Sequence, residues 1–161
     1  MKIILPDKSL RELPEGSSGY DLAKDIGPGL AKSAVAVTIN GIQKDLHDVI
    51  EGDVSASIIT IDSDEGIEIM RHTLTAQVLA RAVKNIYPNS KLAIGPTIED
   101  GFYYDVETEE AISIDDLKKI EDEMIKIVKT KSSITKKLVS KEEALKIFKS
   151  HLIESCVWLS K

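Results

Sequence analysis

Apolar and polar positions in the first sixty residues alternate or cluster in a way that divides them into short elements. Alternation and β-branched residues predict five strands, at 2–5, 9–13, 34–39, 42–46 and 54–61. Before the third strand, Leu22, Ala23 and Ile26 share one helical face, and a Gly-Pro-Gly run ends that helix. Asn40-Gly41 separates two of the strands and is a strong hairpin signal. The order strand, strand, helix, strand, strand, strand predicts a small α+β domain with the β-grasp arrangement.

An acidic, polar run at 62–65 marks the end of this domain. Asp62 and Glu65 have the three-residue spacing of a capping box, which predicts that a helix begins here. We therefore place the first domain at 1–62 and a second, α+β domain at 63–161.

A stripe of apolar residues opens the second domain. It predicts one long helix that runs to about Tyr87, where Pro88 stops it. The apolar face of this helix is expected to consist of Ile67, Met70, Leu74, Val78 and Ala82, widened by Leu79, Val83 and Ile86.

Short strands and helices are predicted for the rest of the second domain. The strands are expected at 92–94, 101–106 and 136–139, the first two around a Gly95-Pro96 turn. Helices are expected at 113–131, capped by Ser113, and at 140–148, where Ser140 and Glu143 have capping-box spacing. No element is predicted after Lys149.

Charge and cysteine content narrow the functional classes. The net charge of −6 and the pI near 5.1 provide no global positive field, so we expect no DNA partner. The single cysteine, Cys156, excludes an internal disulfide and fits a reducing compartment. The chain shows no signal-peptide pattern and no apolar run of about 20 residues, so no membrane partner is expected. These features together predict a cytoplasmic protein.

Candidate chemistry gathers between Met70 and Asp105. The chain has two phenylalanines, four tyrosines and one tryptophan, yet Phe102, Tyr103 and Tyr104 are consecutive. Successive strand residues face opposite sides, so one of the two tyrosines should pack inward and the other should face a cleft. Three scattered histidines and one cysteine offer no ligand cluster, and we expect no metal site.

Residues of the first domain also indicate a family. The run Gly29–Val37, together with Asn40-Gly41 and Asp45-Leu46, resembles the TGS domain. This domain is best known at the N-terminus of threonyl-tRNA synthetases, and it occurs as well in GTPases and in stringent-response enzymes. Core, turn and strand requirements explain nearly all of these residues, so we expect no catalytic residue before Asp62.

The second domain extends the resemblance to most of the chain. Its matching residues are Arg71-His72, Ala80, Ala82-Val83-Lys84, Tyr87-Pro88, Ala93-Ile94-Gly95-Pro96, Ile98–Asp105 and, later, Ser140–Ala144. They are similar to the beginning of the editing domain that follows TGS in bacterial-type threonyl-tRNA synthetases. The final segment, 151–161, departs from that family.

The resemblance implies a specific chemistry. In that family the editing domain hydrolyses mischarged seryl-tRNA, with a His-x-x-x-His pair and a second Cys-x-x-x-His pair. By resemblance, the remnants of the editing pocket in this chain are His72, Asp100 and Tyr104.

Both histidine-containing pairs are incomplete in this sequence. Ala76 stands four residues after His72, and Ser160 stands four residues after Cys156. If one residue is inserted, Gln77 takes the place of the second histidine, at about 140° from His72 on an ideal α-helix. We therefore assign no confident catalytic residue and expect the chain alone to be inactive in both ligation and editing.

Cofactors and partners follow from the same resemblance. ATP, magnesium and zinc belong to the family's catalytic domain, so no cofactor is expected in these 161 residues. The implied partner is tRNA, together with a protein partner or the remainder of the synthetase.

Three hypotheses stay open at this point. The chain is the N-terminal part of a threonine–tRNA ligase, or a free-standing TGS module that binds tRNA, ribosome or a protein partner, or a residual trans-acting Ser-tRNA deacylase.

Overall fold

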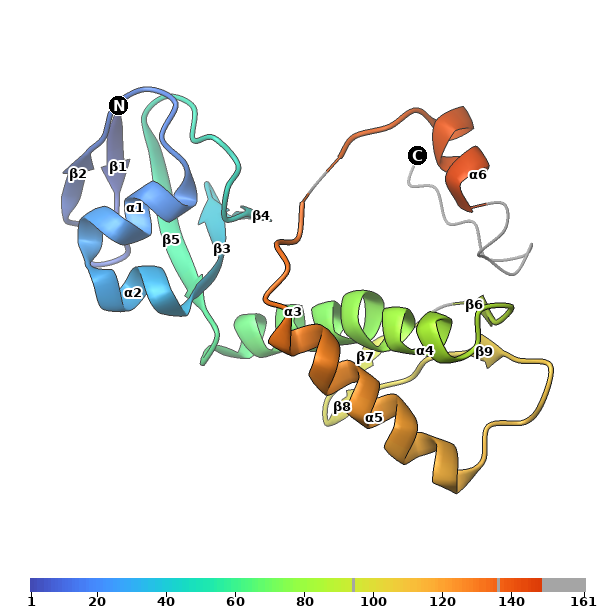
Figure 1. The fold of residues 1–161 in the computed structure, drawn as a ribbon. Helices are drawn as coiled ribbons and strands as arrows, with labels where there is room; N and C mark the ends of the chain where they lie inside the picture. Colours follow the sequence, from blue (N-terminus) through green and yellow to red (C-terminus); the bar gives the residue numbers. More distant parts are fainter. Residues whose placement is uncertain (94, 136, 149–161) are drawn as a thin grey trace. The chain divides into compact units, whose positions relative to one another are not determined.

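The computed structural model describes residues 1–93, 95–135 and 137–148, and it divides into two compact units, Met1–Met70 and Arg71–Lys161 (Figure 1). The predictions for segment 151–161, including Cys156, lie outside the described residues. Within the described part of the chain, no helix has the length and apolar character needed to cross a membrane.

A five-stranded sheet forms the first unit. Its strands are β1 (Lys2–Ile4), β2 (Leu10–Glu12), β3 (Ala34–Ile39), β4 (Ile42–Asp45) and β5 (Val54–Thr60). Their order across the sheet is β2-β1-β5-β3-β4, with β1 and β5 parallel and the other pairs antiparallel. The helices are α1 (Gly19–Ile26) and α2 (Pro28–Ser33), seen together on one side of the sheet in Figure 1. The predicted α+β class is confirmed.

Local sequence signals explain how the first unit folds. Ser18 caps α1, because its hydroxyl accepts from the Asp21 N–H while the Asp21 carboxylate accepts from the Ser18 N–H. Asn40 and Gly41 adopt φ angles of 50° and 81°, as a type I′ hairpin turn requires. Apolar side chains from the sheet, from α1 and from the segment between β4 and β5 then meet in a core that includes Ile3, Leu22, Val37 and Ile50, all fully buried.

The helix after the first sheet begins one residue later than the sequence indicated. In α3 (Asp64–Thr73) the cap is Ser63, not Asp62 with Glu65, so that prediction is wrong. The Ser63 hydroxyl accepts from the Gly66 N–H at 3.1 Å and also donates to the Thr60 carbonyl at 2.8 Å. A hydroxyl can make both bonds, whereas an ionised carboxylate only accepts. Position 66 also demands glycine, because an added Cβ would lie 1.9 Å from the Thr60 oxygen.

The long helix predicted up to Tyr87 is not a single α-helix. It consists of α3, the π-helix η1 (Leu74–Leu79) and α4 (Ala80–Ile86). Tyr87 is its C-cap, so the predicted end before Pro88 is confirmed.

The predicted apolar face of this helix is wrong in its first half. Ile67, Met70 and Leu74 are exposed by 38%, 38% and 36%, whereas Thr75, which was not expected on this face, is buried. The physical reason is the π-helix, whose wider turns change which residues share a face. In the second half, Ala82 and Val83 are buried as predicted.

Two small sheets and two further helices complete the second unit. Its remaining elements are β6 (Lys91–Leu92), β7 (Thr97–Ile98), β8 (Gly101–Phe102), β9 (Val106–Glu107), α5 (Ile114–Lys129) and α6 (Lys141–Phe148). β6 pairs with β9 and β7 pairs with β8, both antiparallel. The core consists of Ala80, Ala82, Val83, Leu92 and Ile120. Residues 137–139 are not a strand, in contrast to the prediction.

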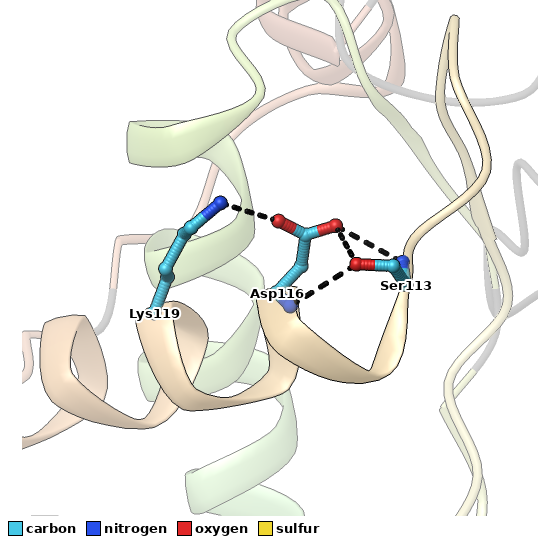
Figure 2. Close-up of polar contacts among 3 residues, drawn as sticks. All are labelled: Ser113, Asp116 and Lys119. Carbon is cyan, nitrogen blue, oxygen red and sulfur yellow. Dashed lines mark hydrogen bonds and ion pairs between the residues drawn. The ribbon is translucent and has the colours of Figure 1, made fainter.

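Both predicted serine caps in this unit are present. Figure 2 shows the cap of α5, where the Ser113 hydroxyl accepts from the Asp116 N–H at 3.3 Å and donates to the Asp116 carboxylate at 2.6 Å. Lys119 also donates to this carboxylate, at 2.8 Å. These bonds, that of Lys119 first, hold the pKa of Asp116 well below its usual value. At α6, the Ser140 hydroxyl accepts from the Glu143 N–H at 3.2 Å.

Candidate functional site

The three residues assigned by resemblance occupy different environments. His72 lies in the last turn of α3 and is exposed. Asp100 is an exposed residue of the turn between β7 and β8. Neither side chain forms a hydrogen bond or ion pair with any residue that the structure describes. Tyr104 follows β8 and is half-buried, so only this residue has a packed setting.

Tyr104 is the tyrosine that turns inward. Its ring packs against the core of the second unit, while the neighbouring Tyr103 is 62% exposed and donates its backbone N–H to the Pro96 carbonyl at 3.0 Å. The two tyrosines face opposite ways, as expected, but they are not strand residues. The predicted strand 101–106 is wrong in its middle, because only Gly101–Phe102 and Val106–Glu107 are strands. Burial raises the pKa of the Tyr104 phenol, because the phenolate is disfavoured away from water.

Gly95 fits closely beside the Tyr104 ring. A Cβ added to Gly95 would lie 2.1 Å from Cδ2 and 2.6 Å from Cε2 of Tyr104. The same Cβ would lie 2.6 Å from Cγ2 of Thr75. The backbone at Gly95 is thus enclosed between the tyrosine ring and the threonine methyl group, and no other amino acid fits there without displacement.

Thr75 connects this packing to the helix. Its side chain is 1% exposed, and its hydroxyl donates to the Arg71 carbonyl at 2.8 Å. Arg71 in turn donates from a guanidinium nitrogen to the Ile98 carbonyl on β7, at 3.4 Å. Arg71 by a hydrogen bond and Thr75 by packing therefore both contact the segment 95–98, which precedes Tyr104.

The residues that follow His72 on the helix provide no second histidine. Ala76 carries no polar group, and Gln77 is exposed on the π-helix. Because Gln77 lies in that π-helix, the angle of about 140° from His72 calculated for an ideal α-helix does not apply. Among the described residues, no group of three or more His, Cys, Asp or Glu side chains could hold a metal ion. The roles of His72, Asp100 and Tyr104 stay predictions.

Sequence reasoning missed Thr75 and Gly95. Thr75 is polar and lies eight residues before Val83, which is out of phase on an α-helix, so periodicity gave no reason to place it inside. For Gly95 the sequence predicts only a turn with Pro96. Its close approach to Tyr104 is a tertiary contact that local sequence does not reveal.

Comparison with known proteins bears on both units. The TGS domain family matches residues 1–60. The chain is also 45% identical, over 148 residues, to the threonine–tRNA ligase of Geobacillus sp. (strain WCH70). This chain carries a TGS domain and resembles the N-terminal region of threonyl-tRNA synthetases. The similar region covers 92% of the chain, so it extends beyond the first unit into the second. The resemblance inferred from the sequence is therefore confirmed.

This chain corresponds to only part of the Geobacillus ligase. The chain spans 23% of the length of the Geobacillus ligase. Similarity to a threonine–tRNA ligase supports the aminoacyl-tRNA synthetase family for these residues. The activity of a complete ligase does not follow from it.

Proposed function

We propose that this chain is the N-terminal region of a threonine–tRNA ligase-like protein of the cytoplasm. In this proposal residues 1–62 are the TGS domain, residues 63–161 are the first part of an editing domain, and tRNA is the partner. The observation that carries the proposal is the 45% identity that continues over 92% of the chain. ATP, magnesium and zinc would act in the catalytic part of such a ligase.

We infer further that the chain alone hydrolyses no mischarged tRNA. Hydrolysis of an aminoacyl ester needs a group that can activate water, and such a group must be held in position. His72 is exposed with no partner among the described residues, and Ala76 offers none one α-helical turn later. Asp100 is likewise exposed, with no hydrogen-bond or ion-pair partner among the described residues. The third candidate, Tyr104, is a phenol that is protonated at neutral pH, and burial raises its pKa further.

A deacylation assay with seryl-tRNA tests this inference directly. The full chain is incubated with Ser-tRNA, and the loss of the ester is followed beside a buffer blank and a His72→Ala variant. We expect all three rates to be equal. Turnover above the blank that disappears in His72→Ala would support a residual trans-acting deacylase instead.

The genomic reading frame tests the proposal as a whole. DNA sequence beyond the codon for Lys161 is expected to continue in frame into the rest of an editing domain and a ligase catalytic domain. A stop codon directly after Lys161 would reject this and favour a free-standing module.

A free-standing binding module is the second candidate. It is favoured by the first unit, which has its own five-stranded sheet and its own buried core. Separate titrations of the full chain with tRNA and with ribosomes measure whether these residues bind either partner without the rest of a ligase.

A further inference from the structure

The position of Thr75 depends on the π-helix. Eight residues of ideal α-helix turn through about 800°, which would leave Thr75 about 80° away from Val83. Both are nevertheless buried in the second unit, with exposed fractions of 1% and 2%. Within η1 the Ala80 N–H reaches back five residues to the Thr75 carbonyl. The wider turn holds one more residue than an α-helical turn, and this extra residue brings Thr75 onto the same buried side of the helix as Val83.

A polar residue in that place is satisfied within its own turn. The hydroxyl of Thr75 donates to the Arg71 carbonyl, so burial leaves no hydrogen-bonding group unpaired. The bond leaves the methyl group free for packing. That methyl is directed at Gly95, whose other near neighbour is the ring of Tyr104.

We propose that Thr75 is a positioning residue of the candidate site, which fixes the ring of Tyr104 by packing against it across Gly95. The proposal rests on the proposed function only in taking Tyr104 as part of a tRNA-binding pocket. The contact itself holds whatever the ligand is. The role of the π-helix is then to direct the β-branched side chain of Thr75 into the interior beside Gly95, a position that an α-helix would not give it.

The contact is first tested in the unmodified chain. The Thr75 methyl carbon and a Tyr104 ring carbon both lie within 2.6 Å of one point, the added Cβ of Gly95. We therefore expect a nuclear Overhauser effect between the Thr75 methyl protons and the Tyr104 ring protons. Its absence in a folded, assigned spectrum would overturn the proposal without any substitution.

The positioning role is tested by titration of the tyrosines. The full chain is labelled with ¹³Cζ-tyrosine, and each phenol is followed by NMR against pH. Thr75→Ser keeps the hydroxyl but removes the methyl, and we expect the pKa of Tyr104 to fall toward 10, since water gains access to the ring. Thr75→Val keeps a methyl facing Gly95 and should leave the pKa of Tyr104 raised.

Tyr87 provides the matched control. Burial is also the main cause that raises its pKa, with the nearby Asp116 adding to it, and it belongs to the same unit. A shift in Thr75→Ser that affects Tyr104 and spares Tyr87 would support positioning. An unchanged pKa of Tyr104, or an equal fall of both values through general loosening, would reject it. Because no tRNA is present, this result is independent of the deacylation assay.

Discussion

Gly95→Ala gives the sharpest test of the second unit. The added methyl carbon would lie 2.1 Å from a Tyr104 ring carbon and 2.6 Å from the Thr75 methyl carbon. Carbon atoms in contact prefer about 3.5–4.0 Å, so one of the neighbours must move. Thr75 is buried and bonded to Arg71, and the Tyr104 ring is packed against the core. Neither is the free end of a flexible side chain.

The expected loss of stability in Gly95→Ala can be taken from the known effect of overpacking in protein interiors. Forcing an extra carbon into a packed site costs roughly 1–3 kcal/mol. For a unit of this size, each kcal/mol lowers the melting temperature by about 4–8 °C. Thermal unfolding followed by near-ultraviolet circular dichroism would report the change, because the tyrosine ring itself is displaced.

Gly101→Ala is the matched control for this experiment. Gly101 lies in the neighbouring strand β8, and a Cβ added there meets no atom within 4 Å. We expect it to change stability by less than about 0.5 kcal/mol. If Gly95→Ala is no more destabilising than Gly101→Ala, the close packing of Gly95 between Thr75 and Tyr104 is refuted. Thr75→Ser in the Gly95→Ala background should recover part of the loss, since it removes one of the crowded carbons.

Three further predictions concern caps and charges. Ser63→Ala should lower the free energy of unfolding by about 1 kcal/mol, while Asp62→Ala should have little effect; equal effects in urea titrations would contradict the observed cap. Asp116 has a pKa lowered in the folded state, so its stabilising contribution is present above about pH 4 and is lost as the pH falls through its folded pKa. Asp116→Asn should therefore flatten the acid limb of a stability–pH curve, and an unaltered limb would count against the cap of α5. Lys84→Met should lower the free energy of unfolding by about 1.5–3 kcal/mol, because Lys84 donates to the Pro88 and Ser90 carbonyls. Lys91→Met removes an exposed ion pair and should lower it by at most about 1 kcal/mol. Equal losses of stability in calorimetry of the two variants would contradict this difference.

The extent to which local sequence predicted this fold differs along the chain. In the first unit, strand alternation and the Asn40-Gly41 turn predicted every strand, because these signals act over a few residues. At the boundary, two acidic residues had the right spacing for a cap, but Ser63 took that place through its second bond to Thr60. In the helix that follows the first sheet, periodicity placed Ile67 and Met70 on the buried face, and the structure exposes both.

The sequence by itself determined the family resemblance, the α+β class, the β-grasp order and the end of the helix before Pro88. These depend on residue type and short spacings, which any stretch of chain carries with it. Only the tertiary structure decided that a π-helix carries Thr75 inward and that Gly95 lies between Thr75 and Tyr104. Thr75 and Gly95 are 20 positions apart in the sequence, and Thr75 and Tyr104 are 29 apart. Packing, not local preference, selects such contacts, because an interior accepts only side chains that fill it without overlap.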